Sequence, residues 1–404
     1  MAALPPPTDL MALPTPVCHD DIFSREAVRN ARAVDDAVRD MGPVVKLARE
    51  NITMVARHEH VSEGLKDWQA FSSTSRPWHD PNSVRPEILL VDDPPRHTAV
   101  RPVIASALSP RALAKMATAF SADADALLRE VKEHETIDAV AAISRPFVYK
   151  VLPDLLGIPQ AGRENMTAFG HMVWATLGPQ NELFHEAMEN VGPVIEWVDK
   201  CCNRENLDPE GLGMQMFLAA DRGAITQDEA KLLVGVLLSA AADTTVMTVS
   251  TAMRAFSLFP DQYRELRRDP SLARSAFEES LRWDSPSRMA GRIAMRDVEF
   301  DGYVIPKGER CGLMFAAANR DPRKWAEPDR FDIRRDLRGN LGWGYGIHAC
   351  VGRTLALLEA DALLGALIRH IERFEPAGEP EPWMTTIGHG PAELPVRIHA
   401  AAGS

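Results

Sequence analysis

The stretch WGYGIHACVG, residues 343–352, decides how the rest of this chain is interpreted. It places a single cysteine, Cys350, between glycines and directly before a strongly helical run, residues 353–369. Glycines let the backbone turn N–H groups toward the sulfur, and the positive end of the following helix lowers the pKa of the thiol. Cys350 is therefore a candidate metal ligand or nucleophile, although a lone cysteine is more often an inert buried side chain.

The composition indicates a large folded protein with no nucleic acid and no membrane as partner. The chain has 404 residues, of which 45% are hydrophobic and 25% are charged, and this balance excludes a disordered chain. Its net charge of -12 disfavours binding to phosphate backbones and anionic membranes. The five cysteines show no paired spacing, so neither a disulfide framework nor a zinc ribbon is predicted. No signal peptide or membrane anchor is recognised, and we expect a cytoplasmic protein.

Helical patterns dominate the chain, and a smaller part of it alternates as strands. The last and longest helical pattern opens with a capping box, Thr226 to Glu229, and would run roughly 50 Å through the body of the protein. Nothing in the composition marks a linker, so we predict a flexible proline-rich segment, residues 1–20, followed by a single domain, residues 21–404. Helices are predicted over residues 21–41, 95–107, 112–132, 138–156, 182–202 and 226–258, strands over 43–47, 51–56 and 294–313, and a long loop over 71–86.

The cysteine loop resembles the haem-ligand signature of cytochromes P-450, Phe-Gly-x-Gly-x-His/Arg-x-Cys-x-Gly, at every position except the first, where Trp343 replaces Phe. Four further motifs occur in the family's order and extend the resemblance from about residue 40 to the end of the chain. The resemblance implies the cytochrome P-450 fold, which is mainly α with a smaller β region. It also implies haem b as cofactor, between the long central helix and the cysteine loop, with the Cys350 thiolate as axial ligand of the iron.

Other charged residues match the family beside this loop. The run ESLR, residues 279–282, and the run PDRF, residues 328–331, imply a buried ion triad of Glu279, Arg282 and Arg330, in which each desolvated charge finds a partner. The ring of Trp343 is expected beside the haem or the sulfur, where its N–H would withdraw electron density from the thiolate. Four residues fall where the family places donors to the haem propionates: His97, Arg101, Arg292 and His348.

The run AAADTT, residues 240–245, is polar within an otherwise apolar helix. A hydrogen bond between helices, or back-bonding of a threonine to its own helix, would explain it structurally. The run also resembles the family's Ala-Gly-x-Asp-Thr-Thr, which implies that Asp243 relays protons and that Thr244 steadies the bound oxygen. Cleavage of the O–O bond requires two protons in a site that is otherwise dry. Ala241 stands where the family usually has Gly, and its methyl group should narrow the oxygen groove.

Several runs resemble a narrower bacterial group, the class I enzymes that oxidise para-substituted benzoic acids. Examples are GPQNEL, residues 178–183, and ANRDPR, residues 318–323. Gly235 and Val236 replace the group's polar carboxylate receptors, and Ala290 and Gly291 replace two aromatic residues, so a wider and less polar pocket is expected. The candidate substrate contacts, which could equally be core residues or surface charges, are Arg76, Arg288, Trp174, Leu177, Val236, Ala240 and Ile387.

The resemblance implies a monooxygenase that uses O2 and two electrons to hydroxylate or O-demethylate a small aromatic molecule, either a methoxyarene or a substituted benzoate. The alternatives are a monooxygenase of a bulkier neutral substrate such as a terpenoid or secondary metabolite, a peroxygenase, and a non-enzymatic haem-thiolate sensor. We expect a monomer whose electrons come from a [2Fe-2S] ferredoxin and an NAD(P)H-dependent ferredoxin reductase. Arginines that would face an acidic ferredoxin are Arg96, Arg101, Arg111, Arg334, Arg335, Arg338 and Arg353.

Overall fold

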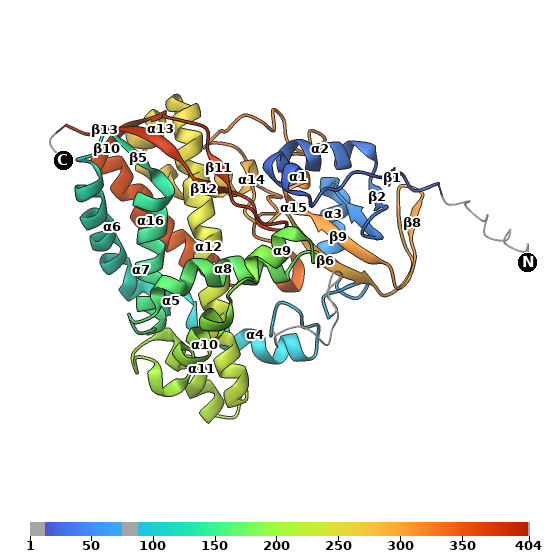
Figure 1. Ribbon diagram of the computed structural model, residues 1–404, viewed down its shortest axis with the longest axis horizontal. Helices are drawn as coiled ribbons and strands as arrows, with labels where there is room; N and C mark the ends of the chain where they lie inside the picture. Colours follow the sequence, from blue (N-terminus) through green and yellow to red (C-terminus); the bar gives the residue numbers. More distant parts are fainter. Residues whose placement is uncertain (1–12, 75–87, 403–404) are drawn as a thin grey trace, which may run out of the picture.

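Most of the helices lie on one side of the molecule, and the larger of the sheets lies on the other (Figure 1). The structure is a computed structural model that describes residues 13–74 and 88–402. The predicted mainly α architecture with a smaller β region is confirmed. The helices are α1 (Arg25–Arg29), α2 (Ala31–Met41), α3 (His58–Lys66), α4 (Arg96–Ala107), α5 (Pro110–Leu113), α6 (Ala117–Val131), α7 (Arg145–Leu156), α8 (Met166–Thr176), α9 (Glu182–Ala187), α10 (Gly192–Cys201), α11 (Leu212–Asp221), α12 (Gln227–Leu258), α13 (Pro260–Arg268), α14 (Ala273–Trp283), α15 (Phe315–Ala318) and α16 (Arg353–His370).

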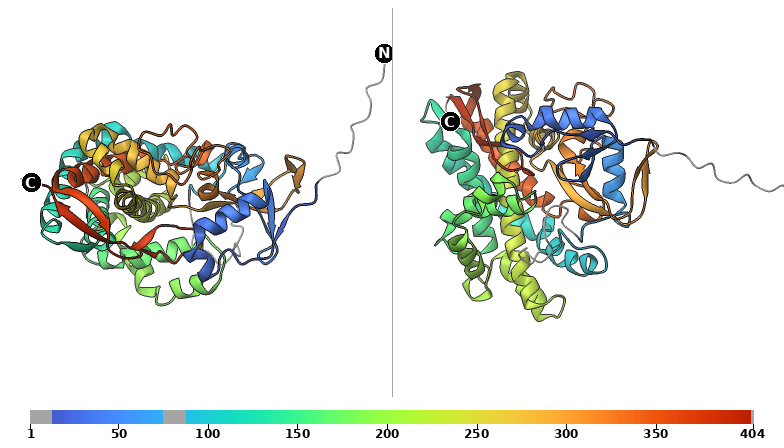
Figure 2. Two further views of the ribbon diagram at one scale, coloured as in Figure 1. Left: turned by 90° about the horizontal axis from the view of Figure 1, so that it is seen from above. Right: turned by 45° about the vertical axis from the view of Figure 1, so that its right-hand side comes forward.

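Helix α12 is the axis of the helical side, and α7, α8, α11, α14 and α16 pack around it. The left view of Figure 2 looks nearly along this helix and shows other helices on several sides of it. Its 32 residues begin at the predicted capping box, in which the Thr226 hydroxyl accepts the N–H of Glu229 and the Glu229 carboxylate accepts the N–H of Thr226. By length and composition α12 could cross a membrane, but most of its apolar stretch is buried inside the protein, as in a core helix.

The main sheet has six strands in the order β1-β2-β3-β9-β6-β4. Strands β3 and β9 run parallel, and β9 and β6 run antiparallel, so the sheet joins the first quarter of the chain to the region just before the cysteine loop. A second sheet has the order β10-β13-β5. The strands are β1 (Val17–Cys18), β2 (Val44–Leu47), β3 (Ile52–Val55), β4 (Phe71–Ser72), β5 (Thr136–Asp138), β6 (Met289–Ala294), β7 (Val298–Phe300), β8 (Tyr303–Ile305), β9 (Arg310–Met314), β10 (Ile371–Pro376), β11 (Glu381–Pro382), β12 (Pro391–Glu393) and β13 (Pro395–Ala400).

Two sequence-based expectations about secondary structure were wrong. The helix predicted over residues 182–202 is split into α9 and α10, because Asn190 takes a left-handed φ of 56° and Pro193 starts a new helix. Part of the N-terminal segment predicted to be flexible is instead bound to the sheet, because Val17–Cys18 pairs in parallel with β2. Residues 1–12 and most of the loop predicted over residues 71–86 lie outside the described residues.

Candidate active site

The cysteine loop is shaped by glycines and by one backbone hydrogen bond. Gly344 and Gly346 take left-handed φ angles of 66° and 67°. A Cβ at Gly346 would lie 2.3 Å from the carbonyl oxygen of Leu65, so only glycine fits at this close approach. The N–H of Cys350 donates to the carbonyl of Trp343 at 2.7 Å and closes the loop. The loop therefore fixes Cys350 immediately before the first turn of α16.

The sulfur of Cys350 accepts the backbone N–H groups of Gly352 and Arg353 at the N-terminal end of α16. Burial raises the pKa of this thiol, and the two N–H groups act against that effect, as do the charges of Arg101 and Arg353. Cys350 is surrounded by many protein atoms, but its side chain is not completely covered by them. This is a setting in which a thiolate can be held as a metal ligand.

Four cationic or potentially cationic side chains from three elements gather near the cysteine loop. His97 and Arg101 lie one turn apart on α4, Arg292 lies on β6, and His348 belongs to the loop itself. The rings of His97 and His348 have centroids 4.9 Å apart. Burial, reinforced by the three neighbouring positive groups, lowers the pKa of His348 to about 3, and burial lowers the pKa of Arg292 to about 10. At neutral pH the two imidazoles are therefore uncharged, and Arg101 and Arg292 carry the positive charge of the cluster.

Within the described residues, several donors of this cluster lack acceptors. The Nε2 atoms of His97 and His348 are buried without a hydrogen-bond partner, and Arg292 donates only to the carbonyl of its preceding residue. Asp93 lies 4.0 Å from His348, but its carboxylate already accepts hydrogen bonds from two serines. A buried ligand with two carboxylates, such as haem b with its propionates, would supply the missing acceptors. The residues present therefore fit this group.

The face of α12 that carries Val236, Ala240 and Thr244 is accessible in the middle of an otherwise buried helix. These residues are spaced by four and so lie in one row. Ala240 is exposed, and Val236 and Thr244 are partly exposed. The Thr244 hydroxyl donates to the carbonyl of Ala240 at 2.8 Å. Accessible surface on a core helix indicates an internal space along this row, and a small ligand could occupy it.

Asp243 turns away from that row into the protein. It is 6% exposed, and its Oδ1 accepts the hydroxyl of Tyr149 on α7 at 2.8 Å. Its Oδ2 is buried, and none of the residues that the structure describes donates a hydrogen bond to it. Burial raises the pKa of Asp243 to about 7, although the Tyr149 hydroxyl and the charge of Arg145 act in the opposite direction. Asp243 therefore changes its protonation state close to neutral pH, as a proton donor in a dry site must.

A second buried carboxyl, Glu359, lies between α16 and α12. It is 1% exposed, and its Oε2 accepts the hydroxyl of Thr245 at 3.2 Å. Burial raises the pKa of Glu359 to about 8. Asp243 and Glu359, which contact different neighbours of α12, are thus two buried carboxyls whose neutral form burial favours.

Comparison with known proteins agrees with this geometry. The cytochrome P450 family model matches residues 164–396. The chain is 38% identical over 392 residues to cytochrome P450 CYP199A2 of Rhodopseudomonas palustris, a match that covers 94% of each chain. It is 30% identical over 359 residues to vitamin D(3) 25-hydroxylase of Pseudonocardia autotrophica, covering 86% of this chain and 88% of that protein. The chain belongs to the cytochrome P450 family.

Solved P450 structures share the fold along most of the chain. CYP109Q5 from Chondromyces apiculatus superposes with a TM-score of 0.80 at 27% identity, over 95% of this chain and 99% of that one. CYP164A2 of Mycobacterium smegmatis gives a TM-score of 0.82 at 27% identity, over 92% and 97%. The protein is thus a P450 monooxygenase with haem b as cofactor, and Cys350 is the cysteine whose thiolate serves as axial ligand. The family and cofactor predicted from the sequence are confirmed.

Trp343 does not play the part in this P450 that its position in the motif suggested. Its indole N–H donates to Glu278 at 3.2 Å rather than to the Cys350 sulfur. Its ring lies against Phe277, with a centroid distance of 6.0 Å, and beneath the guanidinium of Arg353. The expected withdrawal of electron density by this N–H was wrong, because a carboxylate on α14 is the stronger acceptor within reach.

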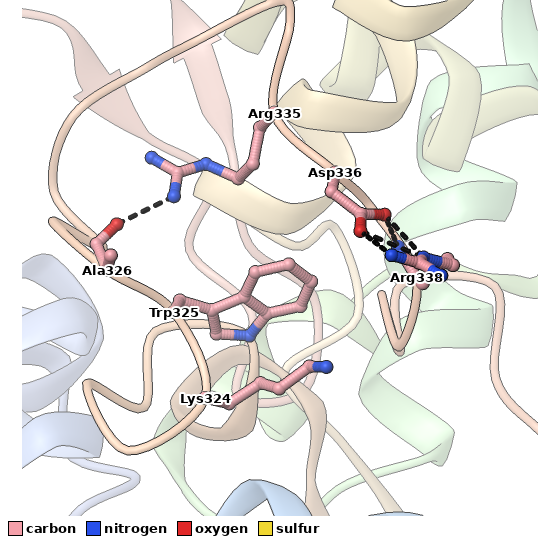
Figure 3. A pocket seen from close by; sticks show the side chains of 6 residues that line it. All are labelled: Lys324, Trp325, Ala326, Arg335, Asp336 and Arg338. Atoms are coloured by element: carbon pink, nitrogen blue, oxygen red, sulfur yellow. Dashed lines mark hydrogen bonds and ion pairs between the residues drawn. The ribbon is translucent and has the colours of Figure 1, made fainter.

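The buried ion triad exists, but its third member is Arg335 and not Arg330. Arg282 forms a bidentate pair with Glu279, and Arg335 reaches the same carboxylate at 3.1 Å. The side chain of Arg330 is 53% exposed and pairs with Glu327, while its carbonyl accepts from Arg282. Figure 3 shows that the guanidinium of Arg335 also donates to the carbonyl of Ala326, in the loop between α15 and the cysteine loop. The loop turns between the two arginines, so only the later one points inward.

The predicted apolar substrate contacts fall into two places. Trp174, Ile387 and Leu177 pack in one cluster, in which the ring of Trp383 meets Trp174 at a centroid distance of 5.7 Å. Val236 and Ala240 lie in the accessible row of α12 described above. Met247 of α12 also belongs to the cluster, which therefore reaches the central helix. The predicted contacts thus divide between a buried cluster that contains two tryptophans and the accessible apolar row of α12.

The two predicted anchors for an acidic substrate have different outcomes. Arg76 lies outside the described residues. Arg288 is fully buried, and its guanidinium donates to both oxygens of Asp35 on α2 and to the carbonyl of Thr386. All three guanidinium nitrogens thus have protein acceptors. Arg288 is a structural residue that links three segments, and it is not a substrate anchor.

The arginines expected to face a ferredoxin are mostly paired. Arg335 is buried in the triad, Arg334 pairs with Glu265, and Arg101 donates to the carbonyl of Ala349. Arg338 remains 90% exposed although it pairs with Asp336, as Figure 3 shows. The others that keep substantial exposure are Arg96, Arg111 and Arg353.

Sequence reasoning missed Tyr149, Gly170 and Glu359. Glu359 could have been recognised from the sequence, because it is a charged residue in the mostly apolar run from Leu355 to Leu367. Tyr149 and Gly170 could not have been recognised in this way, because each contacts Asp243 from a different helix and belongs to no local motif.

Proposed function

We propose that this P450 inserts one oxygen atom from O2 into a C–H bond of a small, uncharged aromatic molecule, and that O-demethylation of a methoxyarene is its characteristic reaction. The observation that carries this proposal is the accessible apolar row of α12, together with an aromatic cluster that reaches the same helix at Met247. Trp174 and Trp383 suit an aryl ring. Ala240 and Val236 keep the neighbouring surface small and apolar.

The absence of a usable anchor among the described residues supports an uncharged substrate. Arg288 is occupied by Asp35, and the positions at which related benzoate-oxidising enzymes place polar receptors hold Gly235 and Val236. A carboxylate on this surface would lose its hydration without gaining a cation. Ala290 and Gly291 leave room for a molecule larger than 4-methoxybenzoate.

We further propose that Asp243 and Thr244 deliver protons to the oxygen being activated. Haem, when bound through Cys350, supplies the oxygen-activating chemistry. Thr244 lies on the accessible row, and Asp243 is the adjacent buried acid with a pKa near neutrality. Electrons would come from a [2Fe-2S] ferredoxin reduced by an NAD(P)H-dependent reductase, with the P450 acting as a cytoplasmic monomer. The burial of α12 in the core supports a location away from the membrane.

Spin-shift titration of the purified haem protein tests the substrate. 4-Methoxybiphenyl should produce a larger low-to-high spin shift than 4-methoxybenzoate, and turnover with a ferredoxin system should release formaldehyde in proportion to NAD(P)H consumed. Tight binding and fast demethylation of 4-methoxybenzoate would contradict the proposal and would indicate an acid anchor, with Arg76 as the first residue to replace.

A second experiment tests proton delivery. Thr244→Ala should still consume NAD(P)H but divert much of it to hydrogen peroxide, and Asp243→Asn should slow turnover by about a hundredfold, the low end of general acid catalysis. Normal rates and coupling in both variants would contradict the relay. Turnover driven by peroxide alone would favour a peroxygenase, and a lack of any turnover would favour a sensor.

A further inference from the structure

The carboxyl of Asp243 is held by a residue outside the acid-alcohol pair. Tyr149 lies on α7, and its hydroxyl donates to Oδ1 of Asp243 at 2.8 Å across the boundary between α7 and α12. Burial raises the pKa of the Tyr149 hydroxyl far above the physiological range, so the tyrosine is always a donor. This hydrogen bond fixes one carboxyl oxygen and thereby the rotamer of the acid.

The other oxygen of Asp243 is fixed from the opposite side by the backbone of α8. A Cβ added to Gly170 would lie 1.8 Å from Oδ2 and 2.7 Å from the carboxyl carbon. No side chain can therefore replace the hydrogen of Gly170 without moving the carboxyl. Tyr149 and Gly170 together hold the acid between two helices, and Oδ2 has no hydrogen-bond partner in the part of the chain that the structure describes.

A small cavity borders the acid at this point. Its volume is about 20 Å³, enough for one water molecule. Thr244 lies on the accessible row of α12, one residue beyond Asp243. The acid thus borders a cavity that is lined partly by polar side chains, and it is adjacent in sequence to the alcohol. The polar residues that line the cavity are Arg145, Tyr149, Thr167, His171 and Asp243.

We propose that Tyr149 is a positioning residue for proton transfer, which holds Asp243 so that the acid can release a proton toward Thr244 and regain one from water in this cavity. The inference rests on the proton-transfer role proposed above for Asp243. In each cycle the carboxylic O–H bond of Asp243 breaks as its proton leaves, and it re-forms with a proton from the cavity, so the acid is unchanged overall.

Electrostatics gives the sign of the effect of removing this hydroxyl. Tyr149 and Arg145 oppose the effect of burial on Asp243, and His171, whose own pKa is lowered by burial, lies across the cavity. Loss of the Tyr149 hydroxyl removes a donor that favours the ionised acid. The pKa of Asp243 should then rise further above about 7.

The experiment compares Tyr149→Phe, Asp243→Asn and the double variant of the holoenzyme, with Tyr263→Phe as control. Tyr263 is also a buried tyrosine, and its hydroxyl donates to the backbone carbonyls of Leu367 and Ile371 on the far side of the core. With 4-methoxybiphenyl, NADPH and a plant-type ferredoxin system, Tyr149→Phe should lower product formed per NADPH by about fivefold, the effect of one lost hydrogen bond to a carboxylate. It should also raise the solvent kinetic isotope effect, whereas the substrate spin shift and the control should not change.

Two outcomes distinguish a failure of the positioning role of Tyr149 from a failure of proton transfer by Asp243. Tyr149→Phe should have no further effect once Asp243 is Asn, because the hydroxyl acts through that acid. Normal coupling in Asp243→Asn would contradict the relay itself. A loss of coupling in Asp243→Asn, with Tyr149→Phe no different from Tyr263→Phe, would overturn the positioning role alone.

A measurement without substrate completes the test. The gain in unfolding temperature from Asp243→Asn should grow between about pH 4 and pH 7 in the otherwise unchanged protein, because the folded acid keeps its proton over this range. In the Tyr149→Phe background the gain should continue to grow above pH 7. Identical pH dependence in both backgrounds would overturn the inference, whatever the turnover data.

Discussion

The two sides of the haem site contain buried ionisable groups of opposite kinds. On the cysteine side, residues 343–353 and the cluster of His97, Arg101, Arg292 and His348 present N–H groups and cations that await an anion. On the α12 side, burial raises the pKa of Asp243 to about 7, and Glu359 of α16, whose pKa burial raises to about 8, reaches the same helix at Thr245. The first side presents groups that favour an anion, and the second presents carboxyls whose neutral form burial favours.

This difference follows from the source of each set of contacts. The cysteine side uses backbone groups positioned by glycines, together with charges that complement a large anionic cofactor. The α12 side has single hydrogen bonds between helices, Tyr149 to Asp243 and Thr245 to Glu359, each of which leaves one carboxyl oxygen unpartnered. A fixed charge is stabilised by many partners, whereas a mobile proton requires few.

Replacing the ligand should remove the function of the cysteine side completely. In Cys350→His, the reduced protein with carbon monoxide should lose the red-shifted Soret band of thiolate-ligated haem, because no sulfur then occupies the N-terminal end of α16. Cys18→Ser, at a buried cysteine of β1 beside the main sheet, serves as control and should keep the band. A band that persists in Cys350→His would mean that another residue is the ligand.

The α12 side can be tested through the pH dependence of stability. The folded-state pKa of Glu359, about 8, lies above the ordinary value of 4.5, so Glu359 destabilises the fold as pH rises between these values. Glu359→Gln should therefore change stability little at pH 4 and increase it by on the order of 3 kcal/mol at pH 9. Chemical unfolding measures this. The exposed Glu196 of α10 is the control, and an equal gain in Glu196→Gln would contradict the argument.

Removing one cation should weaken the cysteine side without abolishing it. Arg292→Met should make haem transfer to apomyoglobin about tenfold faster, since one charge-assisted hydrogen bond to a propionate is lost. The same change should stabilise the haem-free protein, because it relieves repulsion within the cluster. Arg296→Met removes an exposed arginine paired with Asp67 and should do neither. Unchanged haem transfer in Arg292→Met would show that its guanidinium does not face the cofactor.

The smallest effect is expected at the surface of the cysteine side. Charge reversal at Arg96 and Arg338, which are 52% and 90% exposed, should raise the KM for an acidic ferredoxin by about threefold at low salt, since rim charges act mainly on the association rate. The difference should fade at physiological ionic strength, where screening acts over about 8 Å. Arg373→Glu on β10 is the control. Equal KM values at low salt would place the docking surface elsewhere.

The cysteine loop could be predicted from sequence because its glycines, its cysteine and the helix after it follow one another in the chain. Gly346 admits no side chain, and Cys350 and α16 follow it in order. The length of α12 could be predicted for the same reason, from Thr226 and the apolar run behind it. These features depend on residues a few positions apart.

The wrong or missing predictions concern residues whose partners are determined by how the chain folds in space. Arg330 and Arg335 are five residues apart, and only the path of the loop between α15 and the cysteine loop decides which one reaches Glu279. Arg288 was expected to meet substrate, but its acceptor Asp35 lies 253 positions earlier in the chain. Tyr149 could not be found because its role arises only when α7 packs against α12.

The buried pair of Arg288 and Asp35 also bears on how this chain can be made. Asp35 lies on α2, near the start of the chain, and its partner also holds the carbonyl of Thr386, 98 positions further on. During synthesis from the N-terminus, α2 therefore carries an uncompensated carboxylate until most of the protein has left the ribosome. A buried charge without its partner is strongly unfavourable, so α2 cannot complete its packing early. Helix α2 therefore reaches its native environment only after Arg288 has been synthesised.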